Sequence, residues 1–484
     1  MARIGLDFGT TNSAIGRVAQ NGALSVLGPL PSIGAWKNGE VEFFSAAKEA
    51  LKSGDIALHP IRDLKMMLGV RDVSIGRVTL SSIDLASQMI SRLIGRAVKG
   101  DVDLAVLSTP VKFSEEQRSA LLKAASMAGL VNVKLVYEPT AALVGALSES
   151  DAEDGVSLIV DWGGGTLDIA VVVKKRDSFR ELSVGGDVDK LGGSRIDQDI
   201  AKTVLADHPE IEKIISKNEG YYERFLEDIE EEKIDILDDI DGEDGESRMI
   251  APAWAEGEIV DLEPSLVFKT LRKYAEEAGG QILSLLSETH VGLNDITHVV
   301  FAGGVCNSPD VRKILSDLFP RAKEIGTQNP QLITAEGCTA LAKTGFNIEL
   351  AANFGVRQCD GSICCILPDG MSLAAATYRT AEFLLTDVYA PEAVFEFGVN
   401  REGAANGQSL AMTSMSFASL AQLFVPVSHR EAKSAREVPD RIRIYAGIDH
   451  SLTVKIHAES LVGNASKTIA ITGVPLAIHR NGEV

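Results

Sequence analysis

The sequence is short of positive charge and of long apolar segments, and each shortage excludes a class of protein. Acidic residues outnumber basic ones 68 to 47 over 484 residues, so the formal net charge is −21. A surface of that sign repels nucleic-acid backbones and anionic lipids, and we therefore expect no nucleic-acid partner and no membrane partner. No apolar run approaches the length that spans a bilayer, and the first residues form a strand pattern instead of a signal peptide. These features favour a cytoplasmic protein.

Cysteines and the common nucleotide-binding motifs are also scarce. The five cysteines are odd in number and show no metal-ligand spacing with the eight histidines. We expect all of them to be small buried apolar residues in a reducing compartment. The sequence contains no Gly-Lys pair for a P-loop and no strand-borne Gly-x-Gly-x-x-Gly for a dinucleotide fold, so a bound nucleotide would need another kind of site.

The pattern of apolar residues changes near residue 350. The length of 484 residues and the 45% apolar content predict two or three well-filled domains. Up to about residue 345, strands alternate with amphipathic helices, as in α/β layers. One predicted helix begins with a capping box of Ser114 and Gln117, and another begins after Ser308. Beyond residue 350, short alternating strands indicate a β domain, and "RIRIYAGIDHSLTVKIHA" predicts a half-buried hairpin with its turn at residues 449–451.

An acidic stretch, "LEDIEEEKIDILDDIDGEDGE", lies in the first part of the chain. Phe225, Ile229, Ile236 and Ile240 recur near helical spacing along it. We expect a helix whose charges form a solvated face that leads to a polar loop, in preference to a cation site.

Two loops share one pattern of strand, aspartate, bulky residue, glycine and threonine. "IGLDFGTTNS" carries Asp7, and "LIVDWGGGTLDIAVVV" carries Asp161 much later in the chain. The repetition indicates an internal duplication with two lobes that face each other across a cleft. Glycine turns leave backbone amides free to approach phosphate, whereas the two carboxylates would repel it unless a magnesium ion stands between them. Either loop alone would more often be a structural turn, but the pair predicts a magnesium-nucleotide site.

Further segments carry a resemblance to a known family. "IRDLKMMLG", "YEPTAAL", "LGGSRID" and "FAGGVCNSP" occur with the two loops in the order seen in the seventy-kilodalton heat-shock chaperones of the DnaK type, within the actin and sugar-kinase ATPase superfamily. The resemblance covers nearly all of the first 345 residues. It implies an α/β fold with a two-lobed, actin-like ATPase domain at residues 1–345, a short linker at 346–352 and a small all-β sandwich at 353–484 that is similar to a peptide-binding domain.

The resemblance also implies the roles of individual residues. Lys65 would neutralise charge on the transferred phosphoryl group, Glu138 would lie near the attacking water, and Thr166 would hold the terminal phosphate. Asp7 and Asp161 would hold hydrated magnesium, and Asp161 is also counted as catalytic. The residues expected to bind ATP or ADP are Gly9, Thr10, Thr11, Asn12, Gly163, Gly164, Gly165, Gly192, Gly193, Glu230, Lys233, Ile234, Gly303, Gly304 and Asn307.

The expected adenine pocket departs from the family pattern. Ile234 stands where the family has an arginine that stacks on the base, so the cation–π contribution is missing. The adenosine loop has Val305, Cys306 and Asn307 where the family prefers hydroxyls followed by arginine, and Gln331 replaces an acid. These changes leave the base selectivity open. Asp197 is expected to be structural, not catalytic.

The β region resembles the family's peptide-binding sandwich through "FGVRQCDGSICCILPDG", "FLLTDVYAPEAVFEFGVNREG" and "IYAGIDHSLTVKIHAES". The linker keeps only Ile348 and Leu350 as aliphatics, and the chain reaches Val484 without a helical lid, so weak coupling between domains and fast peptide release are expected.

Together these features predict a slow, chaperone-like magnesium-dependent ATPase that binds extended or unfolded peptides, with co-chaperones as possible partners. The alternative is a nucleotide-dependent adaptor with little hydrolysis and one dedicated partner. A filament-forming or sugar-phosphorylating relative is disfavoured by the β region.

Overall fold

Two sheets of the same topology organise the first part of the molecule. The computed structural model describes residues 2–53, 55, 57–148, 153–188, 190–239, 242–252, 254–255, 257–289, 291–326, 329–373, 377–385, 390–400, 417–427 and 440–481. The first sheet, in spatial order, contains β10 (Val133–Tyr137), β9 (Val102–Thr109), β1 (Ala2–Asp7), β2 (Asn12–Val18) and β3 (Leu24–Pro31). The second sheet contains β17 (Lys323–Glu324), β16 (His298–Ala302), β11 (Gly155–Trp162), β12 (Leu167–Lys175), β13 (Ser178–Asp187), β27 (Leu476–Arg480) and β18 (Phe346–Leu350).

The strand pairing confirms the predicted duplication. β1 pairs antiparallel with β2 and parallel with β9, and β11 pairs in the same way with β12 and β16. The central strands are nearly continuous apolar runs because helices cover both faces of each sheet. Asp7 and Asp161 therefore stand at equivalent strand ends, one in each lobe.

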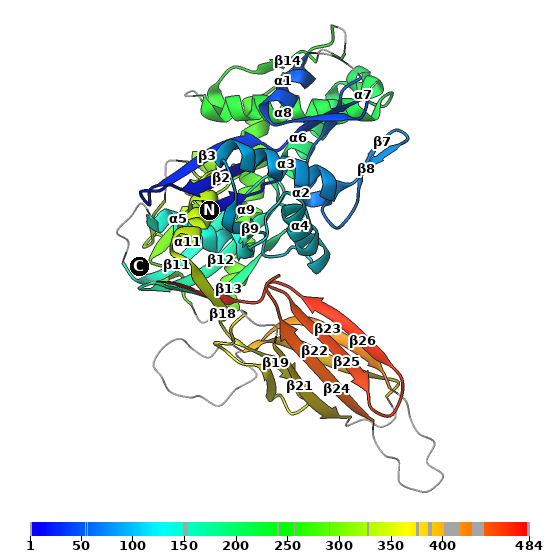
Figure 1. Ribbon diagram of the computed structural model, residues 1–484. Helices are drawn as coiled ribbons and strands as arrows, with labels where there is room; N and C mark the ends of the chain where they lie inside the picture. The colour runs from blue at the N-terminus through cyan, green and yellow to red at the C-terminus, as the bar shows by residue number, and fades with distance from the viewer. Residues whose placement is uncertain are drawn as a thin grey trace.

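The helices repeat between the lobes as well. α4 (Glu115–Met127) connects β9 with β10, as α10 (Pro309–Ser316) connects β16 with β17, and α5 (Glu138–Ser148) and α11 (Ile333–Thr344) follow. The capping box of Ser114 and Gln117 and the cap at Ser308 are confirmed. α5 and α11 pack against each other at two glycines, because a Cβ on Gly145 would lie 2.1 Å from the carbonyl oxygen of Ile333 and one on Gly337 would lie 1.8 Å from that of Ala141. This close crossing joins the lobes (Figure 1).

Smaller elements complete each lobe. The first lobe adds β4 (Gly34–Lys37), β5 (Glu40–Phe43), α1 (Ser45–Lys52), β6 (His59–Ile61), α2 (Leu64–Met67), β7 (Val73–Ile75), β8 (Val78–Leu80) and α3 (Ser82–Ala97). The second adds α6 (Gly193–Asp207), α7 (Pro209–Ile215), α8 (Glu219–Asp238), η1 (Gly242–Asp244), β14 (Arg248–Ile250), β15 (Val260–Leu262), α9 (Pro264–Ser287), η2 (Leu293–Asp295) and η3 (Val305–Asn307). None of the helices in the described part of the chain is both long and apolar enough to cross a membrane.

The β region is a sandwich of two four-stranded sheets, drawn below the lobes in Figure 1. One sheet has the order β20 (Ile363–Leu367), β19 (Asn353–Arg357), β22 (Glu392–Asn400) and β23 (Phe417–Pro426). The other has the order β21 (Thr377–Leu384), β24 (Arg441–Ile448), β25 (Val454–Ser460) and β26 (Ser466–Ile471). The predicted hairpin is confirmed, because Ile448 pairs with Val454 and the alternate apolar residues of both strands are buried. The turn expected in "FLLTDVYAPEAVFEFGVNREG" and the end of the chain at Val484 lie outside the described residues.

Strand pairing joins the β region to the second lobe. Residues 346–350, expected in a linker, form β18, and β27 runs from the sandwich back into the lobe between β13 and β18. This pairing is possible because a strand at the edge of a sheet accepts any neighbour that offers backbone hydrogen bonds. The weak coupling expected between nucleotide binding and the β region stays a prediction. The domain boundaries at residues 345 and 353 stay predictions.

The expectation that all five cysteines are buried is wrong. Cys306 and Cys338 are buried, whereas Cys359 and Cys365 are exposed and Cys364 is partly exposed. The three cysteines of the sandwich lie on or beside β20, an edge strand whose outer face has little to pack against it.

Candidate functional site

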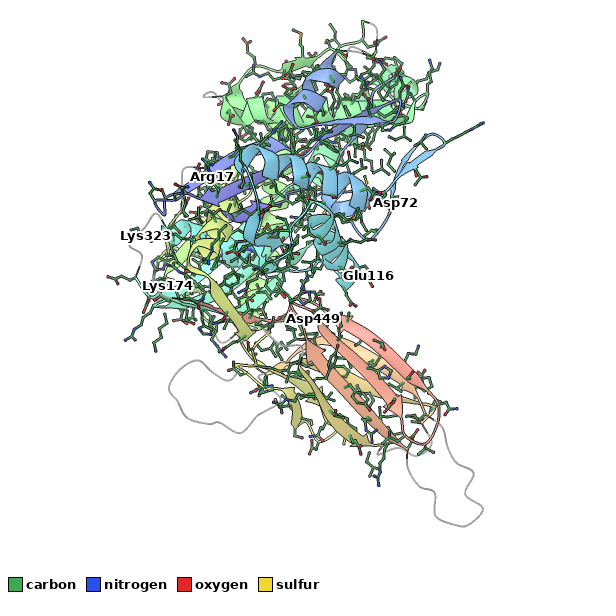
Figure 2. The ribbon with its side chains drawn as sticks, viewed as in Figure 1. Arg17, Asp72, Glu116, Lys174, Lys323 and Asp449 are labelled. Atoms are coloured by element: carbon green, nitrogen blue, oxygen red, sulfur yellow. The ribbon has the colours of Figure 1, made fainter. Side chains whose placement is uncertain are left out.

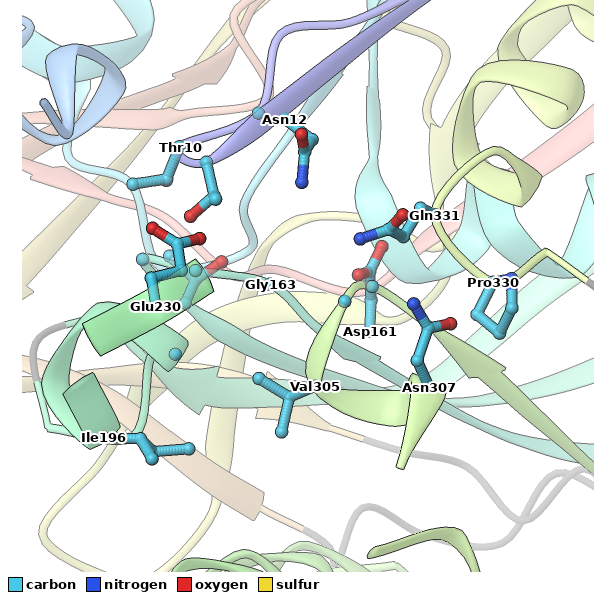
Figure 3. A pocket seen from close by; sticks show the side chains of 18 of the residues that line it. Thr10, Asn12, Asp161, Gly163, Ile196, Glu230, Val305, Asn307, Pro330 and Gln331 are labelled. Atoms are coloured by element: carbon cyan, nitrogen blue, oxygen red, sulfur yellow. The ribbon is translucent and has the colours of Figure 1, made fainter. Parts of the chain in front are cut away.

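A cavity of about 390 Å³ opens between the two lobes (Figure 3). Thr10 and Glu230 lie on one side of it, and Asn307 and Gln331 lie on the other. The lining residues that the sequence predicts are Asp7, Gly9, Thr10, Thr11, Asn12, Lys65, Glu138, Asp161, Gly163, Gly164, Gly165, Thr166, Gly193, Glu230, Lys233, Ile234, Gly303, Gly304 and Asn307. Gly192 is not among the lining residues, since it packs behind the second loop, where a Cβ would lie 2.4 Å from the carbonyl oxygen of Gly164.

The two glycine-containing loops meet at the centre of the cavity. A Cβ on Gly164 would lie 1.9 Å from Oγ1 of Thr11, and one on Gly165 would lie 2.4 Å from Oγ1 of Thr10. Gly9 is equally constrained, because a Cβ at this position would lie 1.9 Å from the carbonyl oxygen of Asn12. Side chains are therefore excluded where the lobes touch, and the backbone amides of these loops remain close to the cavity.

The two strand-end carboxylates face each other across this junction. Oγ of Ser108 donates to Oδ1 of Asp7 at 2.7 Å, and Oγ1 of Thr334 donates to Oδ2 of Asp161 at 2.9 Å. Burial raises the pKa of both aspartates, and burial together with the charge of Asp7 raises the pKa of Asp161 to about 7. Bringing two buried carboxylates together is unfavourable unless a cation or a proton accompanies them.

These carboxylates fit a hydrated magnesium ion. Both are hard oxygen donors, and one oxygen of each is oriented by a hydroxyl group. Among the residues that the structure describes, no three histidine, cysteine or acidic side chains gather into an all-protein metal site. The donor set thus suits an ion that keeps most of its waters, which is the usual state of magnesium in phosphate sites.

Lys65 and Glu138 form a buried ion pair beside the carboxylates. Nζ of Lys65 lies 2.5 Å from Oε1 of Glu138, and the two residues are only 3% and 6% exposed. Although burial opposes it, the charges of Glu138 and Asp7 raise the pKa of Lys65 above its ordinary value. Lys65 thus keeps its positive charge beside the two carboxylates.

The sequence analysis missed Asp168, a buried acid behind the second loop. Its Oδ1 accepts a hydrogen bond from the backbone N–H of Val111 at 2.6 Å, and burial raises its pKa to about 6. Its Oδ2 is buried and has no hydrogen-bond partner in the described part of the chain. The available signal was its position in "GGGTLD", directly after the predicted phosphate loop.

The opposite end of the cavity has a different chemistry. Its walls include Ile196, Leu237, Leu271 and Val305. Of these, only Val305 was predicted from the sequence to lie near the base. Ile234, with 43% of its surface exposed, supplies an aliphatic face here. Asp238, Ser308, Pro330 and Thr334 also line the cavity without having been predicted.

Glu230 and Lys233, two of the residues predicted to bind the nucleotide, are held by neighbouring charges. Glu230 accepts from Nη2 of Arg62 at 2.7 Å, and Nζ of Lys233 lies 2.5 Å from Oδ1 of Asp197. Arg62 also donates to Glu227, so this buried arginine connects the first lobe to α8 of the second. Asp197 lines the cavity and pairs with Lys233, and its structural role stays a prediction.

The predicted acidic helix exists, but its charges are not mostly solvated. α8 has Phe225, Ile229 and Ile236 buried, as expected, while residue 240 lies outside the described residues. Lys48 lies 2.9 Å from Glu227, and Lys52 lies 2.6 Å from Glu231. The prediction was wrong because these acids face basic residues of the first lobe, and sequence periodicity alone does not reveal a facing lobe.

The fold and the site define a two-lobed, actin-like nucleotide-binding domain followed by a β-sandwich. A family model described as Hsp70 protein matches residues 69–345, and the chain belongs to this family. It is 28% identical over 362 residues to the chaperone protein DnaK of Metamycoplasma hominis, covering 69% of this chain and 57% of that protein. It is also 28% identical over 380 residues to a chaperone protein HscA homolog of Methylococcus capsulatus, covering 70% and 58%. The chain thus spans less than two thirds of the length of these relatives.

Proposed function

We propose that residues 1–345 bind Mg·ATP between the two lobes and hydrolyse it slowly to ADP and phosphate. The observation that carries this proposal is the pair of equivalent strand-end carboxylates, Asp7 and Asp161, set beside touching glycine loops and a buried lysine. Family membership and the donor set support the same conclusion. The roles of all individual site residues belong to this proposal.

Each part of the cleft has a distinct task in the proposed reaction. Magnesium, when bound by the waters that Asp7 and Asp161 orient, supplies positive charge to the terminal phosphates. The amides of Gly163 to Gly165 and the hydroxyls of Thr10, Thr11 and Thr166 hold the phosphate oxygens. Lys65 neutralises charge that develops on the transferred phosphoryl group, and Glu138 holds Lys65 and orients the attacking water.

The other end of the cavity would hold the nucleoside. Ile234, Leu271 and Val305 would cover a purine ring by apolar contact, without a guanidinium above it. Glu230 and Lys233 would reach the ribose only after sharing their existing partners, Arg62 and Asp197. A modest affinity for the base and strong dependence on the phosphates follow from this arrangement.

We propose that the β region binds peptides. Val394 and Phe424 pair across β22 and β23 and are 57% and 46% exposed. β21 is an edge strand, and its Tyr378 and Leu384 are 57% and 62% exposed. Exposed apolar side chains beside an open strand edge suit an extended peptide that adds backbone hydrogen bonds. We also propose that co-chaperones are partners of this protein and that it is located in the cytoplasm.

Two measurements test these assignments. Calorimetric titration with Mg·ADP and with ADP in EDTA should show binding that depends on the metal, and single-turnover assays with radiolabelled ATP should show release of phosphate. Absence of any heat in both titrations would remove the nucleotide site altogether.

A peptide array probes the β region. Broad binding of apolar segments that weakens in a Val394→Ser, Phe424→Ser double variant supports the chaperone-like role, with Glu392→Gln on the same strand as the control. Binding of one sequence, together with no phosphate release, would instead support the adaptor.

A further inference from the structure

The last strand of the β region is built into the second lobe. β27 pairs with β13 through Phe179 and Ile478, and with β18 through Ile348 and Ile478. Figure 1 shows this strand, drawn in red, beside β13 and β18. The β region is therefore tied to the nucleotide-binding lobes by strands at both of its ends.

A buried glutamate lies where β27 begins. Glu181 of β13 is 1% exposed, and its Oε2 accepts a hydrogen bond from the backbone N–H of Leu476 at 2.7 Å. Its Oε1 accepts a hydrogen bond from Oγ1 of Thr140, in the first turn of α5, at 2.5 Å. Within the described part of the chain, no lysine, arginine or histidine forms an ion pair with Glu181, so its two hydrogen bonds, with a smaller contribution from the charge of Arg118, compensate its burial.

The segment that Glu181 reaches is also the one that carries Glu138. Tyr137 precedes Glu138 directly, and its hydroxyl donates to the carbonyl oxygen of Val474 at 3.3 Å. The segment from Tyr137 to Thr140 is thus held at both ends by residues 474–476, just before and at the start of β27. Glu138 lies between these two contacts and pairs with Lys65.

A second set of contacts keeps the β region seated at this place. Arg118 of α4 is completely buried, lies over the ring of Tyr137 and donates to the carbonyl oxygen of Leu452 at 2.7 Å. Lys455 of β25 lies 2.8 Å from Glu115 of α4 and 3.1 Å from Asp449. Figure 2 shows Asp449 and Glu116 at this boundary, on its two sides.

We propose that Glu181 is a positioning residue for hydrolysis, which holds the first turn of α5 against β27 and thereby holds Glu138 beside Lys65. The inference rests on the proposed ATPase function and adds a route from the β region to the reacting phosphate. Small displacements of a catalytic group lower the rate strongly, whereas nucleotide affinity depends on other contacts. Loss of the bridge should therefore change the rate of hydrolysis without changing the affinity for Mg·ADP.

The experiment compares variants that break the bridge with variants that keep it. Glu181→Val removes both acceptors, and Thr140→Val removes the donor while keeping the shape. Glu181→Gln and Thr140→Ser each retain groups for both hydrogen bonds. In single-turnover assays, each valine variant should hydrolyse ATP about fivefold to tenfold more slowly, and the glutamine and serine variants should restore most of the rate.

A matched control separates positioning from general stability. Asp440 is another buried carboxyl group, which accepts from Oγ of Ser460 at 2.6 Å and from the N–H of Val462 at 3.2 Å, but it lies in the sandwich. Asp440→Val should lower thermal stability and leave the rate unchanged. The double variant of Glu181→Val and Thr140→Val should be no slower than either single variant, because both changes break one bridge.

The outcomes distinguish this inference from the proposed function. If the wild-type protein releases no phosphate, the ATPase assignment fails. If the wild type is active and the folded Glu181→Val or Thr140→Val variant matches it, the positioning role is overturned. A similar loss of rate in Asp440→Val would also overturn it. Should Glu181→Val not fold, the comparison of Thr140→Val with Thr140→Ser decides, together with amide hydrogen exchange in α5 and β27, which should accelerate only in the valine variant.

Discussion

The two ends of the cleft, which we propose hold the phosphates and the base and name accordingly, are built in opposite ways. At the phosphate end, acids, hydroxyls and Lys65 are buried around loops in which glycine is required by contact between the lobes. At the base end, Ile234 and other aliphatic residues form the walls, and the charged side chains are already paired with Arg62 and Asp197. We therefore expect the binding energy and the catalytic contacts to be concentrated on the phosphates, with little selection for the base.

The largest expected effect comes from the phosphate end. Replacing Lys65 by alanine removes the charge that we propose lies next to the transferred phosphoryl group, and hydrolysis should slow by about a hundredfold to ten-thousandfold. Single-turnover assays measure the rate, and calorimetry should show that Mg·ADP still binds. Lys174→Ala, near the end of β12 where Lys174 pairs with Asp154, is the control and should be silent. An unchanged rate in Lys65→Ala would show that Lys65 has no part in hydrolysis, and the phosphate end would then not be the catalytic end of the cleft.

Glu181, which lies behind the phosphate end, should make the stability of the protein depend on pH. Burial raises the pKa of Glu181 to about 8, so the folded state holds a proton that the unfolded state releases near pH 4.5. The free energy of unfolding should therefore fall as the pH rises from about 4.5 to 8, by a few kcal/mol, since one pKa unit corresponds to about 1.4 kcal/mol. Denaturant titrations of the wild type and of Glu181→Gln should differ in this slope. Identical slopes would mean that Glu181 titrates normally.

The hydroxyl that orients Asp161 offers a smaller perturbation. Thr334→Val leaves Oδ2 of Asp161 without its donor, and the affinity for magnesium in the presence of ADP should weaken about tenfold. Thr339→Val, in the same helix, is a matched control because its hydroxyl donates only within α11 to the carbonyl oxygen of Ala335. Magnesium titrations at constant ADP measure the difference. Equal affinities in the two variants would contradict the orienting role.

At the base end, adding a side-chain contact to the base should strengthen nucleotide binding. Ile234→Arg places a guanidinium group beside the expected purine, and ATP should bind about threefold to tenfold more tightly through a cation–π contact. Ile234→Gln has a similar polar reach without the charge and should not tighten binding. Competition between ATP and inorganic triphosphate measures the share of affinity that the base contributes. If Ile234→Arg binds ATP no better, the base does not lie against this wall.

The phosphate end could be predicted because its signals are local. The aspartates, glycines and threonines of both loops lie within a few residues of each other, and the strand ends follow from continuous apolar runs. Asp168 escaped notice although it lies in the same segment, because a single buried acid in an apolar strand adds no periodic signal. The hairpin of β24 and β25 was predictable for the same reason as the loops, since its alternation and its turn are contiguous.

The base end and the boundary between the regions could not be predicted in this way. Arg62 meets Glu227 and Glu230 only because the lobes close over each other, so the acidic helix was taken for a solvated face. β18 and β27 are ordinary short apolar strands, and nothing in either segment specifies which strand will lie beside it. The same limit applies to Glu181, whose donors come from α5 and from the far end of the chain.

The amino-acid sequence by itself determined the two lobes, the paired phosphate loops and the sandwich hairpins, because those features depend on short-range periodicity and turn chemistry. Only the tertiary structure decided which charges meet across the cleft and which strand completes the second sheet. The physical reason is that ion pairs and strand edges accept many partners, and the partner is selected by how the whole chain packs.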